Sequence, residues 1–292
     1  MAVLGIIGSG SIGTALARLA IAAGIDVVLA NSRGPHSLSD LVANLGPSAR
    51  AGTPVEAAEA GDWVVSAIPL KNYFALPAAQ LVGKVVLDTG NYYPERDGRI
   101  AVLDSERSTT TELVQDYLAG AKVVKAFNNI VARHIPLLAR SAGAHDRTAV
   151  PIAGNDAHAR VFAAALIDDL GFDVVDAGLL AEGWRFEPET AAYVAPYTAL
   201  SRVPGGLPSD PAALTAALVK EIPTDPGSPL SAAELQSLLA EARPTVHRSL
   251  TGSSDQRRTR ASDIHEGNRL VRIRRTGSPA ADRAARSARR AG

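Results

Sequence analysis

The sequence of 292 residues contains no cysteine. This absence excludes disulfide bonds, thiolate ligands for a metal ion and a cysteine nucleophile. Long hydrophobic runs are also missing, and no uninterrupted apolar segment reaches the roughly 20 residues that a membrane span needs. The apolar N-terminus lacks the basic region of a signal peptide and is interrupted by glycines. We therefore expect a cytoplasmic protein that does not bind membranes.

Familiar catalytic arrangements are absent from the sequence as well. The six histidines show neither metal-ligand spacing nor a carboxylate partner close in sequence, and we expect His134 to be an ordinary, partly exposed helix residue. No G-x-S-x-G nucleophile turn occurs. The sequence thus identifies no catalytic residue and no metal site. It favours a reaction whose chemistry is supplied by cofactors, because the protein then needs mainly to align the reactants and exclude water.

Charge is distributed unevenly along a chain whose net charge is zero. Residues 245–292 contain twelve Arg and four acidic residues, which give this segment a net charge of +8. The segment has few apolar residues, so we expect it to be disordered. Its Arg blocks would attract phosphates nonspecifically, but they lack interleaved aromatic residues or a binding motif. We therefore expect no specific nucleic-acid partner.

Three early glycines have the spacing G-x-G-x-x-G. An apolar strand is expected before them and a helix after them, and a second strand closes a βαβ unit of about thirty residues. In such units the first glycine makes the tight turn, the second admits the pyrophosphate, and the third lets the helix pack closely. The pyrophosphate would lie at the N-terminus of the helix. The predicted dinucleotide-binding residues of this turn are Gly8, Ser9, Gly10, Ser11, Ile12 and Gly13.

The end of the second strand indicates which dinucleotide binds. A site selective for NAD usually has a carboxylate there, which accepts hydrogen bonds from the ribose 2′-hydroxyl. This sequence instead has Asn31, Ser32 and Arg33. A guanidinium can bind a 2′-phosphate through two hydrogen bonds, so these residues favour NADP. The alternative is that Arg33 is an ordinary solvated loop residue.

Strand-like runs alternate with helical patterns, which is typical of an α/β fold. The expected strands are 3–7, 26–30, 50–52, 63–68, 85–88, 122–127, 148–153 and 173–176. The expected helices are 12–23, 37–44, 54–60, 73–81, 109–120, 131–139, 156–170 (capped by Asn155), 210–219 and 232–242. We predict a Rossmann-type, doubly wound and mainly parallel sheet of about eight strands with a small C-terminal extension. The predicted domains are an NADP-binding domain (1–178), a substrate-side or dimer extension (179–244) and the Arg-rich tail (245–292).

Further site residues are expected where other strands end, because ligands of open parallel sheets bind beyond the carboxyl ends of the strands. An apolar turn after the fourth strand could line the path from adenine to nicotinamide, and Asn91 follows the fifth strand. Asn128 ends the next strand, where its amide could bond the nicotinamide or a second substrate, or could cap a helix. The sequence leaves both roles of Asn128 open. The residues of the apolar turn are Ser66, Ala67, Ile68 and Pro69.

Together, these motifs resemble the NADPH-dependent F420 reductase family over residues 1–242. The resemblance rests on GSGSIG at 8–13, NSR at 31–33, SAIPL at 66–70, VVKAFN at 123–128 and DAG at 176–178. It implies a Rossmann core, NADP(H) as cofactor, and often a homodimer. The implied reaction is reversible hydride transfer between the nicotinamide C4 of NADPH and C5 of the deazaflavin coenzyme F420. By the same resemblance, Ser32 and Arg33 hold the 2′-phosphate, Ile68 and Pro69 border the nicotinamide, and Asn128 approaches the second ring.

Other functions are compatible with the same residues. One is reduction of a flavin-like acceptor, on whose ring Trp184 and Tyr197 could stack, although aromatic residues at a domain edge often serve packing. Another is reduction of a small imine or carbonyl, which usually needs a positioned proton donor. A third is a non-catalytic NADP(H)-binding redox sensor, because a Rossmann domain alone does not fix function. Turnover distinguishes the enzymes from the sensor.

Overall fold

We analysed a computed structural model of the chain, which describes residues 2–205, 207–208 and 210–243. Residues 1–243 belong to one compact unit. The expectation of disorder for residues 245–292 lies outside the described residues. In the described part of the chain, no helix is both long and apolar enough to cross a membrane.

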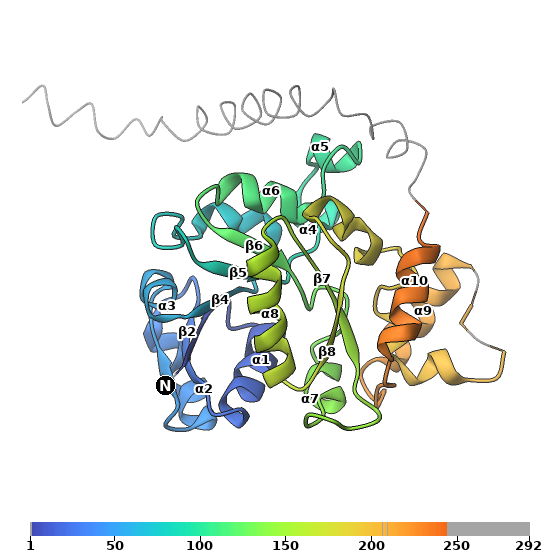
Figure 1. Cartoon of the computed structure of the whole chain (residues 1–292), viewed down its shortest axis with the longest axis horizontal. Helices are drawn as coiled ribbons and strands as arrows, with labels where there is room; N and C mark the ends of the chain where they lie inside the picture. The colour runs from blue at the N-terminus through green and yellow to red at the C-terminus, as the bar shows by residue number, and fades with distance from the viewer. Residues whose placement is uncertain (1, 206, 209, 244–292) are drawn as a thin grey trace, which may run out of the picture. The chain divides into compact units, whose positions relative to one another are not determined.

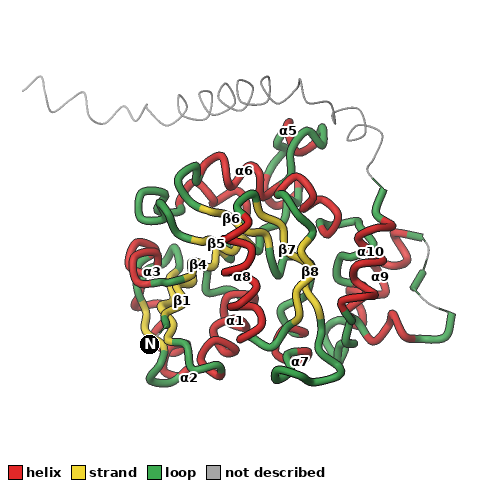
Figure 2. The backbone as a smooth tube through the Cα atoms, viewed as in Figure 1, coloured by secondary structure: helices red, strands yellow, loops and turns green. Residues whose placement is uncertain are grey.

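Eight strands form one sheet in the order β3-β2-β1-β4-β5-β6-β7-β8 (Figures 1 and 2). They are β1 (Val3–Ile7), β2 (Asp26–Ala30), β3 (Ala49–Ala51), β4 (Trp63–Ser66), β5 (Val85–Asp88), β6 (Lys122–Lys125), β7 (Ala149–Gly154) and β8 (Asp173–Asp176). Strands β1 to β6 run parallel; β7 is antiparallel to β6, and β8 is parallel to β7. This confirms the predicted Rossmann-type, mainly parallel sheet. The strand order reverses between β1 and β4, which is the point where such sheets bind their ligands.

Ten α-helices are present in the described residues. They are α1 (Ser11–Ala22), α2 (Ser39–Leu45), α3 (Pro54–Ala60), α4 (Pro94–Asp97), α5 (Ala101–Asp104), α6 (Thr110–Tyr117), α7 (His134–Leu138), α8 (Ala157–Asp169), α9 (Pro211–Glu221) and α10 (Ala232–Glu241). Short 3-10 helices span Pro35–Leu38, Leu70–Ala75, Leu180–Phe186, Ala195–Tyr197 and Ala199–Arg202. In the described residues, capping boxes begin three helices: Thr53 with Glu56 at α3, Thr109 with Glu112 at α6, and Ser231 with Glu234 at α10.

Helices cover both faces of the sheet because successive strand residues point to opposite faces. In β1, Leu4 and Ile6 belong to the core that includes residues of α1, α7, α8 and α10. Their neighbour Ile7 belongs to the core on the other side, which includes residues of α3 and α6. Figure 1 shows α1 and α8 crossing in front of the sheet. Gly5 lies against α3, where a Cβ would come 2.0 Å from the carbonyl oxygen of Ala57.

Two local predictions are wrong. The helix expected over 73–81 is replaced by the 3-10 helix Leu70–Ala75, because Pro77 disfavours a helical conformation at the preceding residue. Leu76 accordingly has φ −63° and ψ 138°. At the start of α8 the capping residue is Asp156, whose side chain accepts from the backbone N–H of Ala159 at 2.8 Å. The Asn155 side chain instead accepts from the backbone N–H of Leu180 at 3.1 Å.

His134 also departs from its expected, partly exposed position. It is fully buried, and its Nε2 lies 3.0 Å from Asp225 Oδ1. Burial lowers the pKa of His134, and the neighbouring Asp225 carboxylate opposes that shift. The residue therefore joins α7 to the segment before α10, which sequence periodicity could not show.

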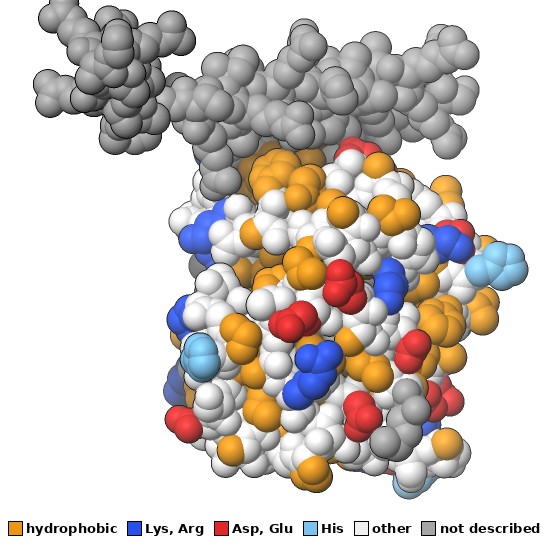
Figure 3. Space-filling model, turned by 90° about the vertical axis from the view of Figure 1, so that its left-hand side faces the viewer, with side chains coloured by type: hydrophobic (Ala, Val, Ile, Leu, Met, Phe, Trp, Pro, Cys, Tyr) orange, Lys and Arg blue, Asp and Glu red, His pale blue; other side chains and the backbone are white. Residues whose placement is uncertain are grey.

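The surface on the side of the N-terminal strands carries mixed charge. On the face shown in Figure 3, acidic and basic side chains are scattered among apolar ones instead of gathering into a patch of one sign.

Candidate dinucleotide and hydride-transfer site

The glycine turn has the backbone geometry of an anion site. Gly8 has φ +119°, and a Cβ there would lie 2.2 Å from the carbonyl oxygen of Ala67. A Cβ on Gly13 would lie 1.9 Å from the carbonyl oxygen of Gly8, whereas nothing lies within 4 Å of the Cβ position of Gly10. The N-terminus of α1 has no side-chain cap. Its free N–H groups and positive dipole end can therefore accept a pyrophosphate over Gly10.

Asn31 links this turn to the loop after β2. Its Nδ2 donates to Ser9 Oγ at 3.2 Å and to Ser37 Oγ at 2.9 Å. Its Oδ1 accepts from the backbone N–H of Arg33 at 2.9 Å. Ser32 and Arg33 are exposed, so both side chains are accessible to a 2′-phosphate. Ser37 lies in the 3-10 helix Pro35–Leu38 that follows this loop. The sequence analysis placed it at the start of a short helix and did not predict its contact with Asn31.

The loop after β4 closes against the glycine turn. Its residues Ala67, Ile68 and Pro69 are half-buried, and the Ile68 side chain lies near Gly8. Ser66 is buried, and its carbonyl oxygen accepts from the backbone N–H of Thr89 at 3.0 Å. This bond ties the loop after β4 to the loop after β5.

Two buried amides meet beyond β5 and β6. Asn91 Nδ2 donates to the carbonyl oxygen of Asn128 at 2.7 Å. Asn128 Nδ2 donates to Asn91 Oδ1 at 3.1 Å and to the carbonyl oxygen of Phe186 at 2.8 Å. Asn128 caps no helix, since α7 begins after Arg133. Its Oδ1 accepts from no group in the described residues and is thus an acceptor at the predicted nicotinamide side.

A buried charge cluster supports the loop that carries Asn91. Lys125 Nζ lies 3.1 Å from Glu187 Oε1, and it donates to the carbonyl oxygen of Gly90 at 3.2 Å. Thr111 Oγ1 donates to Asp88 Oδ2 at 3.0 Å. Burial raises the pKa of Asp88, and the nearby Lys125 ammonium opposes that shift. The sequence analysis did not predict this cluster, because Glu187 comes from a segment that is distant in sequence from Asp88 and Lys125.

Aromatic residues of the C-terminal part occupy two different positions. Tyr197 is fully buried; its hydroxyl donates to the carbonyl oxygen of Ala149 at 3.1 Å and accepts from Asn129 Nδ2 at 2.9 Å. It therefore cannot stack on a ring, which corrects that expectation. Trp184 is half-buried, with the guanidinium of Arg185 5.0 Å from the centroid of its ring. Next to Asn91, the hydroxyls of Tyr93 and Tyr193 share a hydrogen bond.

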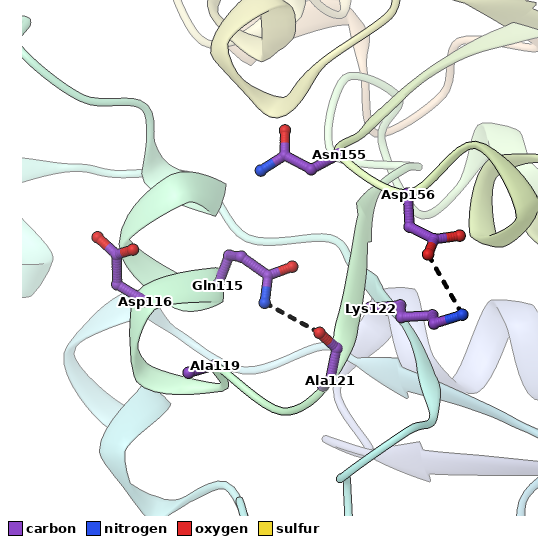
Figure 4. A pocket seen from close by; sticks show the side chains of 7 residues that line it. All are labelled: Gln115, Asp116, Ala119, Ala121, Lys122, Asn155 and Asp156. Carbon is purple, nitrogen blue, oxygen red and sulfur yellow. Dashed lines mark hydrogen bonds and ion pairs between the residues drawn. The ribbon is translucent and has the colours of Figure 1, made fainter. Parts of the chain in front are cut away.

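A hollow of about 500 Å³ lies elsewhere on the molecule (Figure 4). It lies beside Lys122 at the start of β6, whereas the amide pair lies beyond the end of that strand. Inside it, Lys122 pairs with Asp156 at 3.2 Å, and Gln115 Nε2 donates to the carbonyl oxygen of Ala121 at 3.0 Å. The hollow lies away from the carboxyl ends of the parallel strands, where ligands of such sheets bind, so it does not compete with them as a cofactor site.

The fold and the glycine turn define a dinucleotide-binding Rossmann protein, and comparisons give its family. The model of the family "NADP oxidoreductase coenzyme F420-dependent" matches residues 3–92. The chain belongs to this family, and it is an NADP-dependent oxidoreductase. No curated protein sequence matches the chain.

Among the solved structures that are similar to the chain are two bacterial proteins. A hypothetical protein of Sinorhizobium meliloti is 32% identical, with a TM-score of 0.57 over 66% of this chain and 93% of its own. A proposed F420-dependent NADP reductase of Arthrobacter sp. FB24 is 26% identical, with a TM-score of 0.53 over 63% of this chain and 87% of its own. Both likenesses cover most of the solved protein, so the family relation extends beyond the glycine turn.

Proposed function

We propose that the protein transfers a hydride between NADPH and a deazaflavin of the coenzyme F420 type. One observation carries this proposal. The glycine turn and the Asn31–Arg33 loop lie at the same edge of the sheet as the buried pair of Asn91 and Asn128, beyond the ends of neighbouring strands. The family and the Arthrobacter neighbour support the choice of a deazaflavin.

NADPH would bind with its pyrophosphate over Gly10 and its 2′-phosphate at Ser32 and Arg33. The Asn31 side chain fixes the spacing between these two subsites, because it bonds to Ser9 and to the backbone of Arg33. The nicotinamide would lie beside Ile68 and Pro69, with Asn128 Oδ1 able to accept from its carboxamide. Protein groups in this arrangement align two rings and exclude water, while the cofactors supply the redox chemistry.

Anaerobic stopped-flow mixing with NADPH tests the acceptor, using oxidised F420 and, in parallel, FMN. Rapid loss of the deazaflavin absorbance with F420, and little change with FMN, is the expected result. NADPH binding without reduction of either acceptor would overturn the F420 assignment and favour a redox sensor. Reduction of FMN alone would favour a flavin-like acceptor.

From the family resemblance, we also propose a homodimer that acts in the cytoplasm. Light scattering of the purified full chain tests the oligomeric state. A mass equal to one chain at micromolar concentration would contradict the dimer.

A further inference from the structure

Two phenols from distant parts of the chain meet through their hydroxyls, and one of them, Tyr93, belongs to the loop that carries Asn91. Tyr93 follows Asn91 by two positions in the loop after β5, and its hydroxyl hydrogen-bonds to that of Tyr193. The guanidinium of Arg96 lies 4.8 Å from the centroid of the Tyr93 ring and donates to the carbonyl oxygen of Asn91 at 2.7 Å. The phenol pair is therefore attached to the loop that carries Asn91.

The second tyrosine is attached to the loop after β6. The backbone N–H of Val194, the residue after Tyr193, donates to the carbonyl oxygen of Asn129 at 2.8 Å. Val194 and Phe127 both have φ of 54°, a left-handed conformation that side chains with a Cβ rarely adopt. Such strain persists where surrounding contacts impose it, and it gathers at functional sites. Both tyrosines are half-buried, so the pair is reachable from the surface.

We propose that the Tyr93–Tyr193 pair supplies the proton that accompanies hydride transfer. This inference rests on the proposed function. A hydride leaves C4 of NADPH and forms a C–H bond on the acceptor ring, which thereby gains a negative charge. A phenol O–H bond breaks, its proton neutralises the reduced acceptor, and water then returns a proton to the phenolate. Two electrons and two hydrogens are thus added to the acceptor, and NADP⁺ is released.

The pairing of two phenols suits this role. The pair has two hydroxyl protons and uses one in the bond between its oxygens, so the second can be donated. In the described residues, neither hydroxyl has another hydrogen-bond partner. After donation, the remaining O–H stabilises the phenolate through a charge-assisted hydrogen bond.

Burial favours the neutral, protonated form of Tyr193 by raising its pKa. Burial and the neighbouring Tyr93 raise the pKa of Tyr193, while the Arg96 guanidinium opposes that shift. Asp97 lies on the other side of Arg96, and its Oδ2 accepts from the backbone N–H of Tyr93 at 3.0 Å. Since Asp97 also pairs with Arg96 at 2.8 Å, the local charges largely cancel.

The test compares Tyr93→Phe and Tyr193→Phe with wild type in anaerobic single turnovers of NADPH and F420, followed from about pH 6 to pH 9. Each variant keeps its ring and loses its hydroxyl. We expect F420 reduction to slow about 100-fold, within the range that general acid catalysis contributes. Its rate should also fall with rising pH in the variants and stay level in wild type, because solvent must then supply the proton. NADPH affinity should not change.

Tyr117→Phe is the matched control, because it deletes a phenol hydroxyl on α6 that donates to the carbonyl oxygen of Phe74. It should react like wild type. If both tyrosine variants reduce F420 at the wild-type rate and with the wild-type pH profile, the phenol proposal is overturned and the reductase proposal stands. A wild-type protein that binds NADPH and reduces no acceptor overturns both.

Discussion

Replacing Lys125 with Met should destabilise the protein strongly. Lys125 is fully buried and is the cation of a cluster that includes Asp88 and Glu187. Met keeps most of the length of the side chain and removes the charge. Two carboxylates would then remain close together without their counter-ion, in a site where Asp88 is only 3% exposed.

Removing one partner of a buried ion pair costs about 3–5 kcal/mol, because the other charge is left uncompensated. We expect a loss of that size in the free energy of unfolding at pH 7. Urea unfolding followed by far-UV circular dichroism measures it. The control is Lys84→Met, which removes an ammonium that donates to the carbonyl oxygens of Glu59 and Gly61 and lies apart from this cluster.

The loss of stability in Lys125→Met should depend on pH and should become smaller in acid. Burial already raises the pKa of Asp88, and removal of Lys125 removes an interaction that lowers it. A carboxyl whose pKa is higher in the folded state contributes stability below its unfolded pKa and loses it as pH rises through the folded pKa. The difference between wild type and Lys125→Met should therefore shrink as the pH falls from 7 toward 4. A deficit below about 1 kcal/mol at pH 7, or one that does not shrink with acid, would refute this account of the cluster.

Four further changes have expected outcomes. Arg33→Ala should weaken NADPH binding at least about tenfold and barely change NADH binding, because only NADPH has the 2′-phosphate; calorimetry with Arg18→Ala as control measures this, and equal losses would contradict the assignment. Gly13→Ala should abolish NADPH binding and lower the melting temperature, because its Cβ would lie 1.9 Å from the carbonyl oxygen of Gly8; unchanged binding would show that the turn can shift. Tyr197→Phe should cost about 1–3 kcal/mol in urea unfolding, because Asn129 and Ala149 lose a buried partner; a neutral effect would speak against this bond. Deletion of residues 245–292 should leave NADPH affinity and turnover intact, and a large loss of either would place the tail in the site.

The part of the structure that sequence predicts well is the part whose contacts are local. Strands β1, β2, β5 and β8 have the bounds expected from their apolar runs. The G-x-G-x-x-G spacing also predicts its own geometry, because the positive φ of Gly8 and the close approach at Gly13 arise within six residues. The prediction of a helix over 73–81 was wrong because it gave more weight to the periodic apolar pattern than to Pro77. Pro77 is the stronger local constraint.

Residues that meet across long stretches of chain were missed. Tyr93 and Tyr193 are 100 positions apart, and Asn128 donates to Phe186 across 58 positions. No periodicity encodes such contacts, and a tyrosine in a loop has no sequence mark that separates a buried hydrogen bond from surface exposure. Asn128 was found because it ends a strand, but its partners could not be.

The proposed site has an NADP side, which depends on local contacts, and an acceptor side, which depends on contacts between distant parts of the chain. The NADP side is built from turns that directly follow β1 and β2, so short motifs suffice to identify it. The acceptor side that we propose depends on residues 183–197, because Glu187 pairs with Lys125 and the carbonyl oxygen of Phe186 accepts from Asn128. A substitution in that segment would change the surroundings of the proposed acceptor without touching the glycine turn. The family model, which matches residues 3–92, therefore indicates the nucleotide more directly than the acceptor.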